Sequence, residues 1–204
     1  MLEVLVTIVI LAFGMLGLAG MQSKMYSAEM ESYQRAQALV LLNDMVDRIN
    51  ANRYVAANYT HLTNTLGHYG PLPLQEDTIY GTATDQDCPT KTTPTDPVTG
   101  LPYPLGVLRD LCEWSNALKG AAETSGTAKV GGMVGAVGCI TQIQAQNTAA
   151  GVCTPGIYLV SVAWQGVNAT TVPAASCGQG LFGSDDRLRR VISARVSIGL
   201  PSCQ

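Results

Sequence analysis

Six cysteines are the side chains with the clearest chemical potential in this sequence. They are widely spaced, and they stand at Cys88, Cys112, Cys139, Cys153, Cys177 and Cys203. None forms a C-x-x-C pair, and the histidines, His61 and His68, are distant from all six, whereas zinc ligands usually come in close pairs. An even number of separated cysteines is typical of disulfides in an oxidising compartment. We therefore expect the globular part of the protein to lie outside the cytoplasm.

The other reactive residues do not form a recognisable catalytic or metal-binding set. A metal or general-base role for His61 or His68 needs converging partners, and none is visible, so we expect both in exposed loops. Two acidic pairs lack the D-x-[DN]-x-[DN]-G frame of a calcium loop; they are Asp85 with Asp87 and Asp185 with Asp186. Ser161 lacks the G-x-S-x-G elbow of a serine hydrolase. The sequence therefore favours a protein that is not an enzyme and holds no cofactor.

The charge of the chain argues against a nucleic-acid partner. Lys and Arg number 12 against 15 Asp and Glu, for a net charge of −3. One small basic cluster, Arg187, Arg189 and Arg190, stands beside two acidic residues, and a solvated face fits it better than a DNA site. Charged residues are only 13% of the chain, although hydrophobic residues make up an ordinary 47%. The composition must therefore be uneven along the sequence.

The unevenness lies at the N-terminus. The run from Val4 to Met21 carries no charge and is long enough to cross most of a bilayer core. The side chains that we expect to anchor it are Val4, Leu5, Val6, Ile8, Val9, Ile10, Leu11, Phe13, Leu16 and Leu18. The only charge before the run is Glu3. Since a carboxylate is costly in lipid, Glu3 either lies in water at a fraying helix end or pairs with a neighbouring chain's N-terminal ammonium.

The first residues, Met-Leu-Glu-Val-Leu-Val-Thr-Ile-Val-Ile-Leu, resemble the N-terminus of type IV pilins and pseudopilins. In that family a prepilin peptidase removes a basic leader that ends in Gly, the new N-terminus is methylated, and a glutamate follows shortly after it. Glu3 matches this glutamate. The family has further residues before the glutamate, and we expect these and the leader to lie upstream of Met1. The resemblance implies that Glu3 meets an N-terminal amine when the helices assemble.

Beyond the apolar run we expect the helix to continue. No Pro or Gly interrupts the next thirty or so residues, and apolar residues recur at helical spacing at Ala38, Leu42, Met45 and Ile49. Residues 1–21 are thus expected to be the transmembrane half of one helix and residues 22–53 its amphipathic half. Residues 54–204 would then form a periplasmic or extracellular head.

We expect the head to combine one short helix with antiparallel strands. The Pro-rich segment 59–104 predicts loops, and the apolar spacing over 105–118 predicts a helix. Runs of β-branched residues predict strands over 136–144, 157–165 and 189–199. These strands can form a sheet with one buried face, which the long helix would cover, and Trp114 and Trp164 would lie in the core. The predicted fold class is α+β.

Three motifs of the head resemble the PilV type of minor pilin, in which a D-L-x-x-W-like helix precedes a G-x-V-C strand and a V-x-W-Q strand. The matching residues are Asp110-Leu111-Cys112-Glu113-Trp114, Val137-Gly138-Cys139 and Val162-Ala163-Trp164-Gln165. The resemblance implies a type IV pilin-like fold, with a long N-terminal helix packed on an antiparallel sheet.

The sequence alone cannot choose among the many possible sets of three disulfides. As a hypothesis we expect the local set, Cys88–Cys112, Cys139–Cys153 and Cys177–Cys203. The last of these pairs would tie the C-terminal strand to the loop before it, as a C-terminal disulfide does in many pilins.

The resemblance implies a structural protein, a minor pilin that primes or tips the type IV pilus. Its partners would be other minor and major pilins, the pilus assembly machinery and inner-membrane lipid. It would reside in the inner membrane before assembly and in the extracellular fibre afterwards. A minor pseudopilin of a type II secretion system would share these features. From a different class, an anchored periplasmic binding module or adhesin also fits, because the Thr- and Pro-rich loops are compatible with it.

Overall fold

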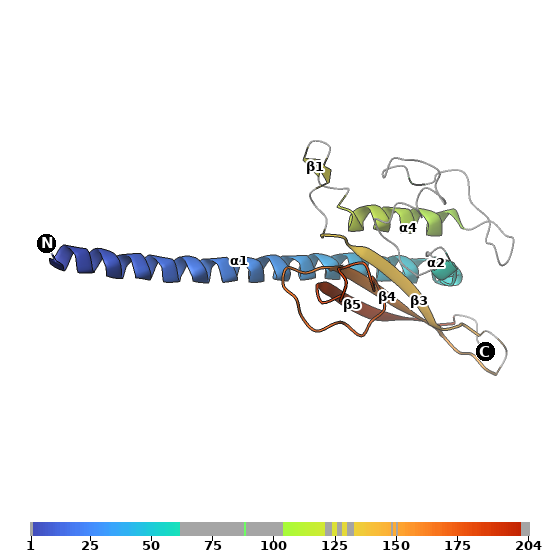
Figure 1. The fold of residues 1–204 in the computed structure, drawn as a ribbon. Helices are drawn as coiled ribbons and strands as arrows, with labels where there is room; N and C mark the ends of the chain where they lie inside the picture. The colour runs from blue at the N-terminus through green and yellow to red at the C-terminus, as the bar shows by residue number, and fades with distance from the viewer. Residues whose placement is uncertain are drawn as a thin grey trace. The chain divides into compact units, whose positions relative to one another are not determined.

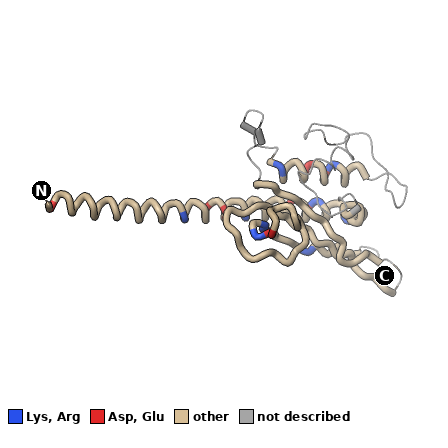
Figure 2. The backbone as a smooth tube through the Cα atoms, in the orientation of Figure 1, with Lys and Arg blue, Asp and Glu red and all other residues tan. Residues whose placement is uncertain are grey.

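The computed structural model of the protein describes residues 2–61, 88, 104–120, 124–125, 128–129, 133–147, 149 and 151–200. The chain divides into two compact units, Met1–Ala36 and Gln37–Gln204. Helix α1 (Leu2–Ala51) begins in the first unit and ends in the second. It confirms the predicted long N-terminal helix, and Figure 2 shows its beginning almost without charged residues.

The remaining described elements all belong to the second unit, which we call the head. They are η1 (Arg53–Val55), α2 (Asn58–His61), α4 (Leu105–Leu118), β1 (Thr124–Ser125), β2 (Ala128–Lys129), β3 (Val137–Gln144), β4 (Gly156–Gln165) and β5 (Arg189–Ile198). The predicted helix over 105–118 is confirmed, and each of the three predicted strands is present within a residue of its expected bounds. Most of the segment expected to form loops lies outside the described residues.

The main sheet of the head is antiparallel, with the strand order β3-β4-β5 (Figure 1). Its register pairs Ile140 with Val160 and Tyr158 with Val196. A shift between Gln142 and Gln144 interrupts the β3–β4 ladder. Strands β1 and β2 form a separate two-stranded antiparallel sheet. Together with the long helix, this confirms an α+β arrangement.

One face of the main sheet forms the principal core with the end of α1 and with α4. The helical stripe predicted from spacing supplies its share from α1, because Ala38, Leu42, Met45 and Ile49 are all buried. The sheet contributes Ile140, Tyr158, Val160, Val162, Trp164, Val196 and Ile198. Strand alternation places these side chains on the same face.

The opposite face of the sheet was expected to be exposed, and for one end of the sheet that prediction is wrong. A second buried cluster lies there; it consists of Val137, Cys139, Ala163, Cys177 and Phe182, with Val191 packed against it. Phe182 and Cys177 come from the long β4–β5 connection, which covers the strands at this end. Alternation along the strands could not reveal this cover, because the cover is an irregular segment with no periodicity of its own.

Candidate functional site

The beginning of α1 is an unusually large exposed apolar surface. Its large apolar side chains are exposed by between 43% (Val9) and 80% (Leu2). They occupy consecutive positions, such as 4–6 and 8–11, so every side of the helix is apolar. The helix is long and apolar enough to cross a membrane by length and composition, and none of its most apolar window is buried within the protein. This segment has to be covered by something other than the described part of its own chain.

Glu3 is the single charged side chain on this part of the helix. It lies in the first turn of α1, where a negative charge interacts favourably with the helix dipole, and it is exposed. Within the part of the chain that the structure describes, no cation forms an ion pair with it. The predicted anchor residues and Glu3 therefore share one helical segment.

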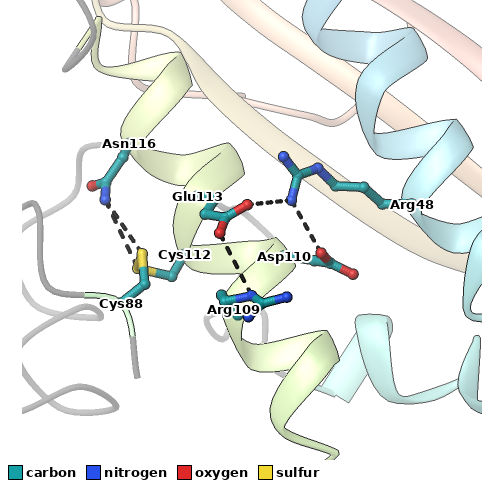
Figure 3. Close-up of a disulfide and its surroundings, with 7 residues drawn as sticks. All are labelled: Arg48, Cys88, Arg109, Asp110, Cys112, Glu113 and Asn116. Atoms are coloured by element: carbon teal, nitrogen blue, oxygen red, sulfur yellow. Dashed lines mark hydrogen bonds and ion pairs between the residues drawn. A yellow bond between two sulfur atoms is a disulfide. The ribbon is translucent and has the colours of Figure 1, made fainter. Parts of the chain in front are cut away.

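A polar cluster joins the end of α1 to α4 inside the head (Figure 3). The Arg48 Nη1 atom lies 2.7 Å from Glu113 Oε2 and 3.0 Å from Asp110 Oδ1, and Arg48 Nε lies 3.0 Å from Asp44 Oδ2. Burial by itself lowers the pKa of Arg48, but the contacts with Glu113, Asp44 and Asp110 outweigh it and raise the pKa above its ordinary value. The Arg48 guanidinium is thus held permanently charged between the two helices.

The other side of Asp110 engages α2. Its Oδ2 atom accepts hydrogen bonds from the Tyr59 hydroxyl at 2.5 Å and from the Asn52 amide at 2.8 Å. Burial of Tyr59, reinforced by its bond to Asp110 and by the Asp110 charge, raises the pKa of the phenol. Asp110 therefore links α4 to the end of α1 and to α2. This role gives a structural reason for an aspartate at its position in the D-L-x-x-W-like motif.

Trp114 lies one turn after Asp110 in α4 and contacts both α1 and β3. Its indole Nε1 donates a hydrogen bond of 2.8 Å to the Leu41 carbonyl of α1. The ring lies so close over Gly138 of β3 that a Cβ at this position would overlap it. The predicted core position of Trp114 is confirmed, and Trp164 is buried as predicted too. The Trp and Gly motifs thus form one interlocked contact between α4 and β3.

The calcium and histidine candidates are not brought together in the described residues. Asp185 is exposed and accepts the Arg187 amide, whereas Asp186 is buried and accepts the Gly180 amide. The expected loop position of His61 is wrong, because His61 ends helix α2. His68, Asp85 and Asp87 lie outside the described residues. Where the structure describes the chain, no group of three or more His, Cys, Asp or Glu residues could hold a metal ion.

The basic cluster was expected on a solvated face, and for Arg189 that prediction is wrong. Arg189 is only 1% exposed and points to the face of the sheet that carries the second cluster. Arg190, the next residue, points to the other face and donates hydrogen bonds to Thr170 Oγ1 at 2.7 Å and to the Asn168 carbonyl at 2.6 Å. Strand alternation separates the two neighbours, but nothing in a run of arginines marks which one is buried.

The predicted Cys88–Cys112 disulfide is confirmed, and it ties residue 88 to α4 (Figure 3). The predicted Cys139–Cys153 and Cys177–Cys203 pairs are wrong, because Cys139 is bonded to Cys177. Cys153 is also disulfide-bonded, and Cys203 lies outside the described residues. Cys153 adjoins Thr154, which bridges to Asn147 beyond the far end of β3. Asn147 is eight residues along the chain from Cys139, and at about 3.3 Å per residue Cys153 therefore lies roughly 25 Å from Cys139, too far for a disulfide.

Sequence reasoning did not single out Arg48, Asn52 or Tyr59 as parts of one cluster. The signal that could have found Arg48 is its place beside the apolar stripe, three residues after Met45 and one before Ile49. The chain matches no protein-family model, no curated protein and no solved structure.

Proposed function

We propose that this protein is a structural minor pilin of a type IV pilus. The observation that carries the proposal is the beginning of α1, which is apolar on every side, not buried by the described part of its own chain and charged only at Glu3. Such a helix requires lipid or other apolar helices around it, and a pilin uses both in turn. The resemblance of the first residues to pilins supports the same assignment.

In this proposal the helix is stored in the inner membrane and then extracted into a bundle of like helices in the fibre. Glu3 would pair with the N-terminal amine of a neighbouring subunit, and the pair would set the axial register of the incoming helix. Burying a lone carboxylate among apolar helices costs about 2.5–3.5 kcal/mol even on lenient scales. A cationic partner that offsets this cost would therefore strongly favour entry of the helix into the fibre. The head would supply contacts to other minor pilins.

The test is the Glu3→Val variant in cells that assemble the fibre. We expect normal levels of the variant in the membrane, because removing a charge favours lipid insertion. Its share in purified fibres should fall about tenfold or more, since a lost interaction of about 1.4 kcal/mol changes an equilibrium tenfold. Thr7→Val is the matched control: it removes a polar group from the same segment, where the Thr7 hydroxyl bonds only the nearby Val4 carbonyl at 2.9 Å. Wild-type incorporation of the Glu3→Val variant would refute the mechanism.

A minor pseudopilin of a type II secretion system has the same anchor and would show the same Glu3 dependence in a different machine. Affinity purification of the full chain in detergent separates the two, because a pilin should recover other minor pilins and a pseudopilin should recover secretion components. An anchored binding module or adhesin that does not assemble would recover neither.

A further inference from the structure

The β4–β5 connection, residues 166–188, is irregular but heavily fixed. The Gly180 amide bonds both carboxylate oxygens of Asp186, at 3.0 and 2.8 Å, and the Gln179 amide bonds the Ser176 carbonyl at 3.0 Å. The Cys139–Cys177 disulfide then joins the middle of this segment to β3. A loop of this length normally has little to hold it, so the source of its order needs an explanation.

Arg189 supplies much of that order. Its guanidinium donates hydrogen bonds to three backbone carbonyls of the loop: Cys177 at 2.8 Å, Pro173 at 3.0 Å and Ala175. Its Nε atom lies 3.4 Å from Asp186 Oδ2, an ion-pair contact without hydrogen-bond geometry. A buried arginine is costly unless its donors are engaged, so the folded head strongly favours the loop conformation that engages them.

Chain statistics alone would favour a different disulfide for Cys139. Cys153 is much closer to it in sequence than Cys177, which is 38 residues away. Loop-closure entropy favours the shorter loop by about four- to fivefold in a flexible chain. Structure overrides this preference in two ways: the β3–β4 ladder holds Cys153 far from Cys139, and the folded β4–β5 connection brings Cys177 to Cys139.

We propose that Arg189 is the positioning residue that brings Cys177 to Cys139, and that it orders the loop before the disulfide forms. By binding the Cys177 carbonyl together with two carbonyls just before it, the guanidinium places the Cys177 thiol over the buried end of β3. Cys139 and Cys177 then each lose a proton, and together they transfer two electrons to a disulfide oxidant, which leaves as its dithiol. The new bond locks a conformation that Arg189 has already produced.

Oxidative refolding of the full chain in detergent micelles, with reduced and oxidised glutathione, tests this role of Arg189. Peptide mapping without reduction should find Cys139 linked to Cys177 in the wild type. In Arg189→Met, a severalfold smaller share of Cys139 should be linked to Cys177, and the remainder should be recovered as free thiol or as a mixed disulfide with glutathione, because the β3–β4 ladder keeps Cys153 out of reach. Arg190→Met is the matched control, because Arg190 also binds the loop but on the other face of the sheet, and it should give the wild-type map. A wild-type map for Arg189→Met would overturn the proposal.

A second measurement remains informative if Arg189→Met refolds poorly. The double variant Cys139→Ser/Cys177→Ser cannot form the bond, so hydrogen exchange at the Gln179 and Gly180 amides reports the loop without it. We expect both amides to remain protected in the double variant, and we expect their protection factors to fall at least tenfold when Arg189→Met is added. Exchange at the rate of an unstructured chain while Arg189 is still present would show that the disulfide orders the loop, contrary to the proposal.

Discussion

The beginning of α1 and helix α4 are both rich in apolar side chains, but they use them differently. In α4 the apolar residues lie on one side, and Leu111 and Trp114 are completely buried. In the first turns of α1 they lie on every side, and Leu16 and Phe13 remain 68% and 71% exposed. The chemistry of the side chains is the same, and only their arrangement around the helix differs.

This difference separates two sources of free energy. Fully burying a leucine or phenylalanine is favourable by about 1.5–3 kcal/mol. For α4 that free energy is realised within one chain and stabilises the head. For the start of α1 it is realised only when lipid or another helix covers the surface, so it contributes to insertion and assembly instead. Mutations in the two regions should therefore have separable effects.

The largest expected effect would come from removing the side chain that joins both helices to the sheet. Trp114→Ala should lower the free energy of unfolding of the head by about 3–5 kcal/mol, because it leaves a cavity and removes the indole hydrogen bond to the Leu41 carbonyl. Chemical denaturation of the full chain in detergent, followed by tryptophan fluorescence, which Trp164 still supplies in the variant, measures it. Trp114→Phe, which loses the indole N–H but keeps an aromatic ring, should lose less. A loss below about 1 kcal/mol for the alanine variant would contradict the core assignment.

The same substitution at two leucines compares the regions directly. Leu111→Ala should cost the head about 2–5 kcal/mol, whereas Leu16→Ala should change its unfolding by no more than about 0.5 kcal/mol. Denaturation in the same micelles measures both variants. Equal losses would mean that the start of α1 contributes to the stability of the head, and the comparison would fail.

A smaller effect is expected from the polar cluster between α1 and α4. Arg48→Met should destabilise the head by about 1–2 kcal/mol, since Asp110 keeps its bonds to Tyr59 and Asn52. Arg109→Met is the control, because Arg109 reaches Glu113 only at 3.6 Å and both side chains are largely exposed; its loss should stay below about 0.5 kcal/mol. Thermal unfolding would rank the two. Equal losses would show that the Arg48 contacts between the helices contribute no more than a surface pair.

The smallest effect concerns pH. The pKa of Tyr59 is raised in the folded head, so its contribution to stability is complete below the ordinary tyrosine pKa of about 10 and is lost as the pH rises further. The wild type should therefore lose stability between about pH 10 and 11, and Tyr59→Phe should lose less over the same range. Tyr158, whose pKa burial also raises, contributes to the loss in both proteins. Identical losses of stability with pH in the wild type and in Tyr59→Phe would show that ionisation of Tyr59 does not contribute to the loss.

Features with a local pattern could be predicted from the sequence. The bounds of α4 follow from apolar spacing, the strands from β-branched runs, and the buried stripe from Ala38 to Ile49 from its helical period. The Cys88–Cys112 pair agrees with a local pairing rule. Each of these properties is encoded within the segment that shows it.

Features that depend on distant backbone could not be predicted. Arg189 is buried because three carbonyls of the β4–β5 connection surround it, and carbonyl groups are present in every sequence. Cys139 pairs with Cys177 because that connection folds back over the sheet, and no periodic pattern in the sequence predicts this path of the chain. The Arg48 cluster likewise depends on how α4 docks, which its own apolar spacing does not specify.

The contact of Trp114 with Leu41 and Gly138 also determines how the head bears a load. A pull along α1 acts in shear on an indole that is bonded to the helix backbone and seated against β3. Each helical residue rises about 1.5 Å, so a slip by even one residue would break the 2.8 Å bond to Leu41 and drive the ring out of its seat. Trp114 therefore couples α1 to the sheet, and tension in the helix backbone is transmitted to the strands instead of letting the helix slide.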